Sequence, residues 1–105
     1  MIYSPAFFHR LGSRTLSAAY TLTISDSVIL ADATTAAFTA TLPTAIGATG
    51  RQYTIKKTDS SANAVTLGTT SAQTIDGLTT QSLATQWEFL LVASDGANWV
   101  IVGND

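Results

Sequence analysis

Two short runs of alternating side chains, joined by a five-residue polar connection, limit what this chain can fold into. In residues 52–58, Tyr53 and Ile55 fall on one side and polar residues fall on the other, and residues 64–69 resume the same alternation. A period of two is typical of a half-buried strand. Because only residues 59–63 separate the two runs, the pattern predicts an antiparallel hairpin.

The same alternation returns along the chain with a turn signal about every ten residues, and no segment has the pattern of a long helix. The strongest turn signal is Asp95-Gly96, between residues 87–93 and residues 99–102, which predicts a second hairpin. The sequence therefore predicts an all-β domain, namely a small antiparallel β-sandwich of jelly-roll type. The other expected strands are residues 20–24, 27–31, 37–42, 73–76 and 79–83.

The first nineteen residues differ in composition from the Thr- and Ala-rich remainder. We expect residues 1–19 to form an N-terminal docking arm and residues 20–105 to form the sandwich domain. Ser4-Pro5 is typical of a helix start and Gly12 of a helix end, so one short helix is expected in the arm. Two alternatives remain open: the arm docks on a neighbouring chain or the virion, or it packs on its own sandwich. Its apolar docking candidates are Phe7, Phe8 and Leu11.

Composition favours an oligomer. Hydrophobic residues make up 46% of the chain and charged residues only 11%, so a small monomer has few charges with which to cover its apolar surface. Residues 87–93 and 99–102 carry bulky apolar side chains on both faces, which predicts that both faces are covered, one by the core and one by another subunit. The pattern does not tell the two faces apart. The candidate interface residues are Trp87, Phe89, Leu90, Val92, Trp99, Val100 and Val102.

The residues that usually perform catalysis or bind metals are scarce. The chain has no cysteine and one histidine, His9, and its aspartates stand in predicted turns, where Asp commonly bonds its own main chain. We therefore expect a non-enzymatic protein with no cofactor and no metal. The net charge of −2 provides no basic patch for nucleic acid, and no apolar run is long enough for membrane insertion.

A host-surface glycan is the one small-ligand class for which the sequence offers candidates. The pair Lys56-Lys57 fits either a solvated strand edge, which we favour, or contact with an anionic glycan. Trp87 and Trp99 have rings that stack on sugars, although their strands favour core or interface positions. The candidate glycan contacts are Lys56, Lys57, Thr79, Thr80, Gln81 and Asn98.

Three segments carry a resemblance to a known group of proteins. LPTAIGATGRQYTIKKTDSSANAVTL (residues 42–67), TIDG (74–77) and SDGANWVIVGN (94–104) resemble the C-terminal β-domain of phage tail-fibre and receptor-binding proteins. The resemblance implies a homotrimer in the virion, in a tail fibre or on the particle surface, that attaches to the host surface through glycans or to other virion proteins. The alternative is a capsid decoration or trimerisation module, a cap with no receptor binding of its own.

Overall fold

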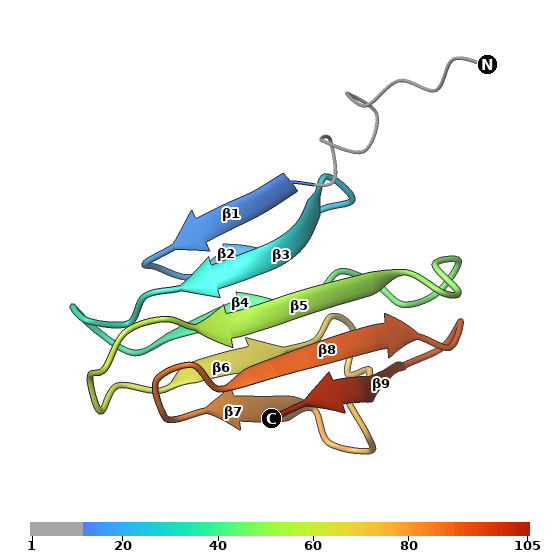
Figure 1. Cartoon of the computed structure of the whole chain (residues 1–105). Coiled ribbons are helices and arrows are strands. Elements are labelled where there is room, and N and C mark those ends of the chain that lie inside the picture. Colours follow the sequence, from blue (N-terminus) through green and yellow to red (C-terminus); the bar gives the residue numbers. More distant parts are fainter. Residues whose placement is uncertain (1–11) are drawn as a thin grey trace, which may run out of the picture.

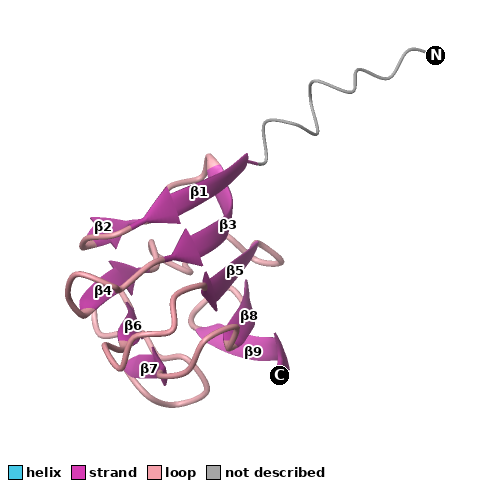
Figure 2. Ribbon diagram, turned by 60° about the vertical axis from the view of Figure 1, so that its left-hand side comes forward, coloured by secondary structure: helices cyan, strands magenta, loops and turns pink. Residues whose placement is uncertain are grey.

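The computed structural model describes residues 12–105, which form two β-sheets that face each other across one core (Figure 1; Figure 2). One sheet has five strands in the order β1-β3-β5-β8-β9, and the other has four in the order β2-β4-β6-β7. None of residues 12–105 lies in a helix, so this part of the chain contains no membrane-spanning helix. The strands are β1 Gly12–Leu16, β2 Tyr20–Thr21, β3 Asp26–Ala31, β4 Phe38–Thr41, β5 Gln52–Lys57, β6 Val65–Gly68, β7 Thr80–Leu83, β8 Phe89–Ser94 and β9 Trp99–Asn104.

The first six strands alternate between the two sheets, so the chain winds around the core in successive coils. Strands β1, β3 and β5 run parallel in one sheet, and β2, β4 and β6 run parallel in the other. Only the later pairs β5–β8, β6–β7 and β8–β9 are antiparallel. The predicted all-β class is confirmed, whereas the prediction of an antiparallel sandwich of jelly-roll type is wrong, because both sheets are mixed.

The predicted hairpin between residues 52–58 and 64–69 is also wrong. Strands β5 and β6 lie in different sheets, and residues 58–64 form an arch between them. Three polar side chains of this arch bond the preceding arch at Ala33. Asp59 Oδ1 accepts the Ala33 N–H at 2.7 Å, while Ser61 Oγ and Asn63 Nδ2 donate to the Ala33 carbonyl at 3.2 and 2.9 Å. The connection is polar because it satisfies the main chain of the coil beside it.

The second predicted hairpin, at Asp95-Gly96, is confirmed. Strands β8 and β9 pair antiparallel, and the turn closes with the Asp95 N–H donating to the Asn98 carbonyl at 3.0 Å. Gly96 has a φ of 100°, which L-residues with a Cβ rarely adopt. A Cβ there would also lie 2.8 Å from Thr49 Oγ1. Glycine is therefore required at this turn for both its conformation and its size.

The predicted boundary between the arm and the domain, at residue 20, would assign strand β1 of the five-stranded sheet to the arm. Residues 12–16 form β1, which pairs parallel with β3, and the Arg14 Nε donates to Asp26 Oδ1 at 2.8 Å. These residues thus belong to the sheet. Phe7, Phe8, Leu11 and the predicted short helix before Gly12 lie outside the described residues, so the docking arm stays a prediction.

Alternation places the expected side chains in the core. Tyr53 and Ile55 are fully buried, and the Trp99 ring meets the Tyr53 ring edge to face with centroids 5.6 Å apart. Ile24 departs from this pattern: alternation along the expected strand 20–24 places it on the same side as buried Leu22, but it is 76% exposed. The reason is that β2 ends at Thr21, so the alternation no longer applies at residue 24.

The alternation that buries Tyr53 and Ile55 also buries Lys57, two residues further along β5. Its side chain has no exposed surface, and Nζ lies 2.7 Å from Asp59 Oδ2. The prediction that Lys57 lies on a solvated edge is therefore wrong. An ammonium group in a low-dielectric interior needs such a partner, because an unpaired buried charge is strongly unfavourable.

We predict that Lys57→Met lowers the free energy of unfolding by about 3–5 kcal/mol, because it leaves the Asp59 carboxylate buried without its counter-ion. The matched control is Lys56→Met, the neighbouring residue on the opposite face of β5, which should change stability by no more than about 1 kcal/mol. Urea unfolding followed by circular dichroism measures both values. Equal losses in the two variants would contradict the role of the buried pair.

Candidate functional site

The outer side of β8 and β9 forms an apolar surface. Along β8, Phe89, Leu91 and Ala93 are half-buried while the residues between them are buried. On β9, Val100 pairs with Ala93, and Val102 is 53% exposed next to the register shift. We call these five residues the apolar face. Alternation from Phe89 predicts that Leu91 and Ala93 belong to it, although neither was among the candidate interface residues.

The structure divides the candidate interface residues between the two faces. Leu90, Val92 and Trp99 are buried and point into the core. Phe89, Val100 and Val102 belong to the apolar face, and Trp87 precedes β8. A subunit interface in this region can therefore use only the outward side chains, because the inward side chains already pack in the core of their own subunit.

Little charge accompanies the apolar face. In the described part of the chain, Lys56 is the one charged residue that β3, β5, β8 and β9 place on this side of the sheet. Its ammonium nitrogen lies 5.2 Å from the centre of the Phe89 ring, a cation–π distance. The centre of an interface that forms within a protein assembly is typically poor in charge and rich in aromatic residues.

Trp87 is the most distinctive exposed residue near this face. It is 55% exposed, and its φ of 73° lies in the left-handed region that non-glycine residues rarely occupy. The Trp87 N–H donates to the Lys57 carbonyl at 2.7 Å, and Glu88 Oε1 accepts the N–H groups of Ala84 and Thr85 at 2.7 and 3.1 Å. These bonds hold the main chain of a strained residue in place, and the indole extends from it into solvent.

The candidate glycan contacts do not come together at one site. Lys56 lies on the outer side of the five-stranded sheet, whereas Thr79, Thr80 and Gln81 lie at β7 of the other sheet. Lys57 is buried and is not available to a surface ligand. The Asn98 side chain joins the β8–β9 turn to the segment before β7, since its Oδ1 accepts the Thr74 N–H at 2.9 Å.

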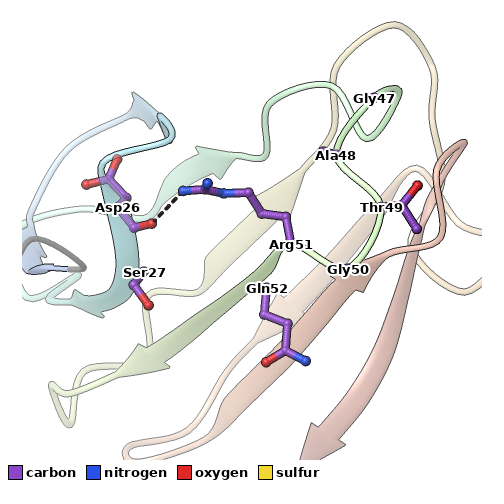
Figure 3. A pocket seen from close by; sticks show the side chains of 8 residues that line it. All are labelled: Asp26, Ser27, Gly47, Ala48, Thr49, Gly50, Arg51 and Gln52. Atoms are coloured by element: carbon purple, nitrogen blue, oxygen red, sulfur yellow. Dashed lines mark hydrogen bonds between the residues drawn. The ribbon is translucent and has the colours of Figure 1, made fainter. Parts of the chain in front are cut away.

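A shallow pocket of about 560 Å³ lies between the start of β3 and the loop before β5 (Figure 3). Its lining residues are Asp26, Ser27, Gly47, Ala48, Thr49, Gly50, Arg51 and Gln52.

Arg51 crosses this pocket and is bonded to the protein itself. Its Nε donates to the Tyr53 hydroxyl at 3.0 Å, and its Nη2 donates to the main-chain oxygens of Ile24 and, at 3.3 Å, Asp26. In Figure 3 the Asp26 carboxylate points away from Arg51, and only the main-chain oxygen of Asp26 meets the guanidinium. Arg51 therefore joins the loop before β5 to the β2–β3 turn.

The carboxylates are similarly engaged in structural bonds, as the turn prediction stated. Asp32 accepts the Thr34 hydroxyl at 2.6 Å and the Thr34 N–H at 2.9 Å, and Asp95 accepts the N–H groups of Asn98 and Ala97 at 2.8 and 2.9 Å. These bonds hold the pKa values of Asp32 and Asp95 below their usual range. Within residues 12–105, no group of three or more Asp, Glu, His or Cys side chains gathers around a point where a metal ion would fit.

Asp26 connects the first three strands. Its burial acts to raise the pKa of the carboxyl, but hydrogen bonds from Arg14, the Thr23 N–H and the Tyr20 hydroxyl outweigh burial and lower the pKa. The guanidinium of Arg14 also lies 4.7 Å from the centre of the Tyr20 ring. The polar groups at this end of the core, beside β1, β2 and β3, are therefore hydrogen-bonded to one another.

A comparison with protein-family models and with curated proteins finds no match to this chain.

We predict that acidification weakens the contribution of Asp26 to stability. A carboxyl whose pKa is lower in the folded state stabilises the fold above its unfolded-state pKa, about 3.9, and loses that contribution as the pH falls toward the folded-state value. Asp26→Asn should therefore be less stable than the natural protein at pH 7, and the difference should narrow between about pH 5 and pH 2. Urea unfolding across this range measures it. A difference that does not vary with pH would contradict the prediction.

Proposed function

We propose that this protein is a non-enzymatic structural protein of a phage virion, a trimeric tail-fibre-like β-domain that attaches to the host surface. The observation that carries the proposal is the apolar face on the outer side of β8 and β9, where Lys56 is the one charged residue that strands β3, β5, β8 and β9 of the described chain place on this side. The resemblance of residues 42–67, 74–77 and 94–104 to tail-fibre and receptor-binding proteins supports the same assignment.

Self-association is the simplest way to cover this face. Contiguous exposed apolar surface of this kind marks interaction sites, and an oligomer of identical chains covers the same surface on every copy. Inward residues such as Leu90 and Val92 already form the core, so the outer residues remain for contact between subunits. The threefold number comes from the resemblance.

Attachment in this proposal needs binding without chemistry. Arg51 and the described aspartates hold turns and loops, so they act as structural groups. The exposed indole of Trp87 is the contact we assign to a host-surface glycan, because aromatic rings stack on the apolar faces of sugars. Three weak contacts on one trimer would bind a cell surface much more tightly than one contact alone.

A second candidate function is a capsid decoration or trimerisation module without receptor binding. The observation that favours it is the dispersal of the other glycan candidates over both sheets, which leaves Trp87 without a cluster of polar partners. Binding assays distinguish the two candidates. The trimer, labelled with a fluorophore, is applied to a glycan array and to a panel of bacterial cells, with Trp87→Ala as the comparison. Binding that Trp87→Ala abolishes supports attachment. No binding by the natural trimer supports the decoration or trimerisation role.

We predict that an aspartate introduced on the inner side of β8 unfolds the subunit, whereas one introduced on the outer side of β9 only separates the subunits. Leu90→Asp places a carboxylate in the core and should unfold the subunit, because burying a side chain of this size contributes about 1.5–3 kcal/mol and an unpaired charge adds a further penalty. Val100→Asp lies on the apolar face and should yield folded monomers. Circular dichroism and analytical ultracentrifugation separate these outcomes. A natural protein that sediments as a monomer at micromolar concentration would contradict the trimer.

A further inference from the structure

The pocket between the start of β3 and the loop before β5 contains a positive charge without a counter-ion (Figure 3). Within residues 12–105, ion pairs are formed by Arg14 and by Lys57, and Arg51 takes part in neither. The groups that bond the Arg51 guanidinium, namely the Tyr53 hydroxyl and two main-chain oxygens, are all neutral. Arg51 therefore holds its loop in place while its charge stays uncompensated.

One nitrogen of this guanidinium is open to a ligand. Nε and Nη2 have partners in the protein, whereas Nη1 has none in the described part of the chain. Arg51 is half-buried, and no buried side-chain nitrogen or oxygen of residues 12–105 lacks a partner, so Nη1 reaches solvent. Because the other two nitrogens already fix the guanidinium, a ligand at Nη1 would order little that is not ordered beforehand.

The carboxylates near the pocket are engaged elsewhere. Asp26 is the one acidic residue that lines it, and the Asp26 carboxylate faces away from Arg51 toward Arg14 (Figure 3). Asp95, in the β8–β9 turn beside the loop, accepts N–H groups of its own turn. Since the charge of Asp26 is balanced by Arg14, the charge that remains in the pocket is that of Arg51.

The other walls of the pocket offer neutral hydrogen-bonding groups. The hydroxyls of Ser27 and Thr49 and the amide of Gln52 have no hydrogen-bond partner in the described chain, and all three side chains reach solvent. Gly47 and Gly50, with φ values of 77° and 86°, turn the loop without side chains that would fill the space. The pocket thus combines one cation with several neutral donors and acceptors.

The size of the pocket is the second indication of what it holds. Its volume is about 560 Å³, whereas a water molecule occupies about 30 Å³ in the liquid. Small-molecule sites typically measure about 300–1,000 Å³. A ligand that fits therefore has a body beside its charged group. The guanidinium suits an oxyanion, and the hydroxyl and amide side chains suit hydroxyl groups on that body.

We propose that this pocket binds an acidic sugar, that is, a small polyhydroxy compound whose carboxylate or phosphate lies at Nη1 of Arg51. An apolar ligand fits less well, because it would desolvate the charge and the neutral polar groups without replacing their hydrogen bonds with water. A neutral sugar would leave the charge uncompensated. The inference rests on the proposed attachment function only for the source of the sugar, a host-surface glycan, since the binding itself follows from the pocket.

The test is a titration of the full-length protein, labelled with nitrogen-15, in which NMR follows the amide signals of residues 47–52. The probes are glucuronic acid, glucose 6-phosphate, glucose and inorganic phosphate. At least one of the two acidic sugars should shift these signals saturably, and the tighter of the two shows whether the oxyanion is a carboxylate or a phosphate. Glucose and inorganic phosphate should each bind at least about tenfold more weakly than that sugar, because each lacks one of the two kinds of contact.

A charge-changing variant places the ligand in the pocket. Gln52→Glu adds a carboxylate to the wall while Arg51 keeps its bonds, and it should weaken binding of the acidic sugar by about tenfold. The matched control is Gln86→Glu, at an exposed glutamine in the connection between β7 and β8, and it should keep the natural affinity. Circular dichroism confirms that both variants are folded. If Gln52→Glu does not fold, Ser27→Asp on the opposite wall replaces it with the same expected loss.

Signals of residues 47–52 that move with neither acidic sugar overturn the proposal. An equal response to inorganic phosphate also overturns it, in favour of an adventitious ion only, and so does an equal loss in Gln52→Glu and Gln86→Glu. Binding to bacterial cells is a separate readout. A protein that binds the acidic sugar but no cells supports this inference and contradicts the proposed attachment, whereas one that binds cells but no acidic sugar contradicts this inference alone.

Discussion

The buried ion pair of Lys57 and Asp59 is the contact on which the arrangement of the two sheets depends. Asp59 accepts hydrogen bonds from Lys57, from Ser61 and from the main chain of Ala33, so one carboxylate connects the end of β5 with two successive arches. These bonds hold the chain after β5 against the preceding arch, and from there it crosses to β6 in the other sheet. Apolar residues in place of the pair would leave the N–H groups of Ala33 and Ser61 without an acceptor, so the pair does more than neutralise two charges.

Local alternation in the sequence predicts much of the secondary structure and of the core. It identifies the strands around β4, β5 and β6, and it orients buried residues such as Phe38, Tyr53 and Val65 correctly. The pairing of strands cannot be read in the same way, because a parallel partner lies one coil away in the chain and leaves no local pattern. Lys57 shows a different error: alternation from Tyr53 predicts that it points inward, but its charge led to a surface assignment.

The sequence indicated which two strands hold the candidate interface residues, but it did not indicate which side of those strands faces outward. Two strands with apolar residues on both sides are evident in the sequence, but only the structure shows that Val92 points inward and Val100 outward. The glycan candidates were chosen by residue type alone, and sheet topology then separated Lys56 from Thr80. The strained conformation of Trp87 has no sequence signal, because it follows from hydrogen bonds to a strand thirty residues earlier in the chain.

The coils of this fold differ in length although their strands stay in register. Fifteen residues separate Leu16 from its partner Ala31, and twenty-six separate Ala31 from its partner Lys57. The extra residues lie in the connections, where they leave the spacing of the sheet unchanged. The paired strands therefore keep one register, while the length of the connections between them varies. A peptide grafted between Thr35 and Ala36, which are exposed in the connection before β4, would be displayed on the surface while both sheets keep their register.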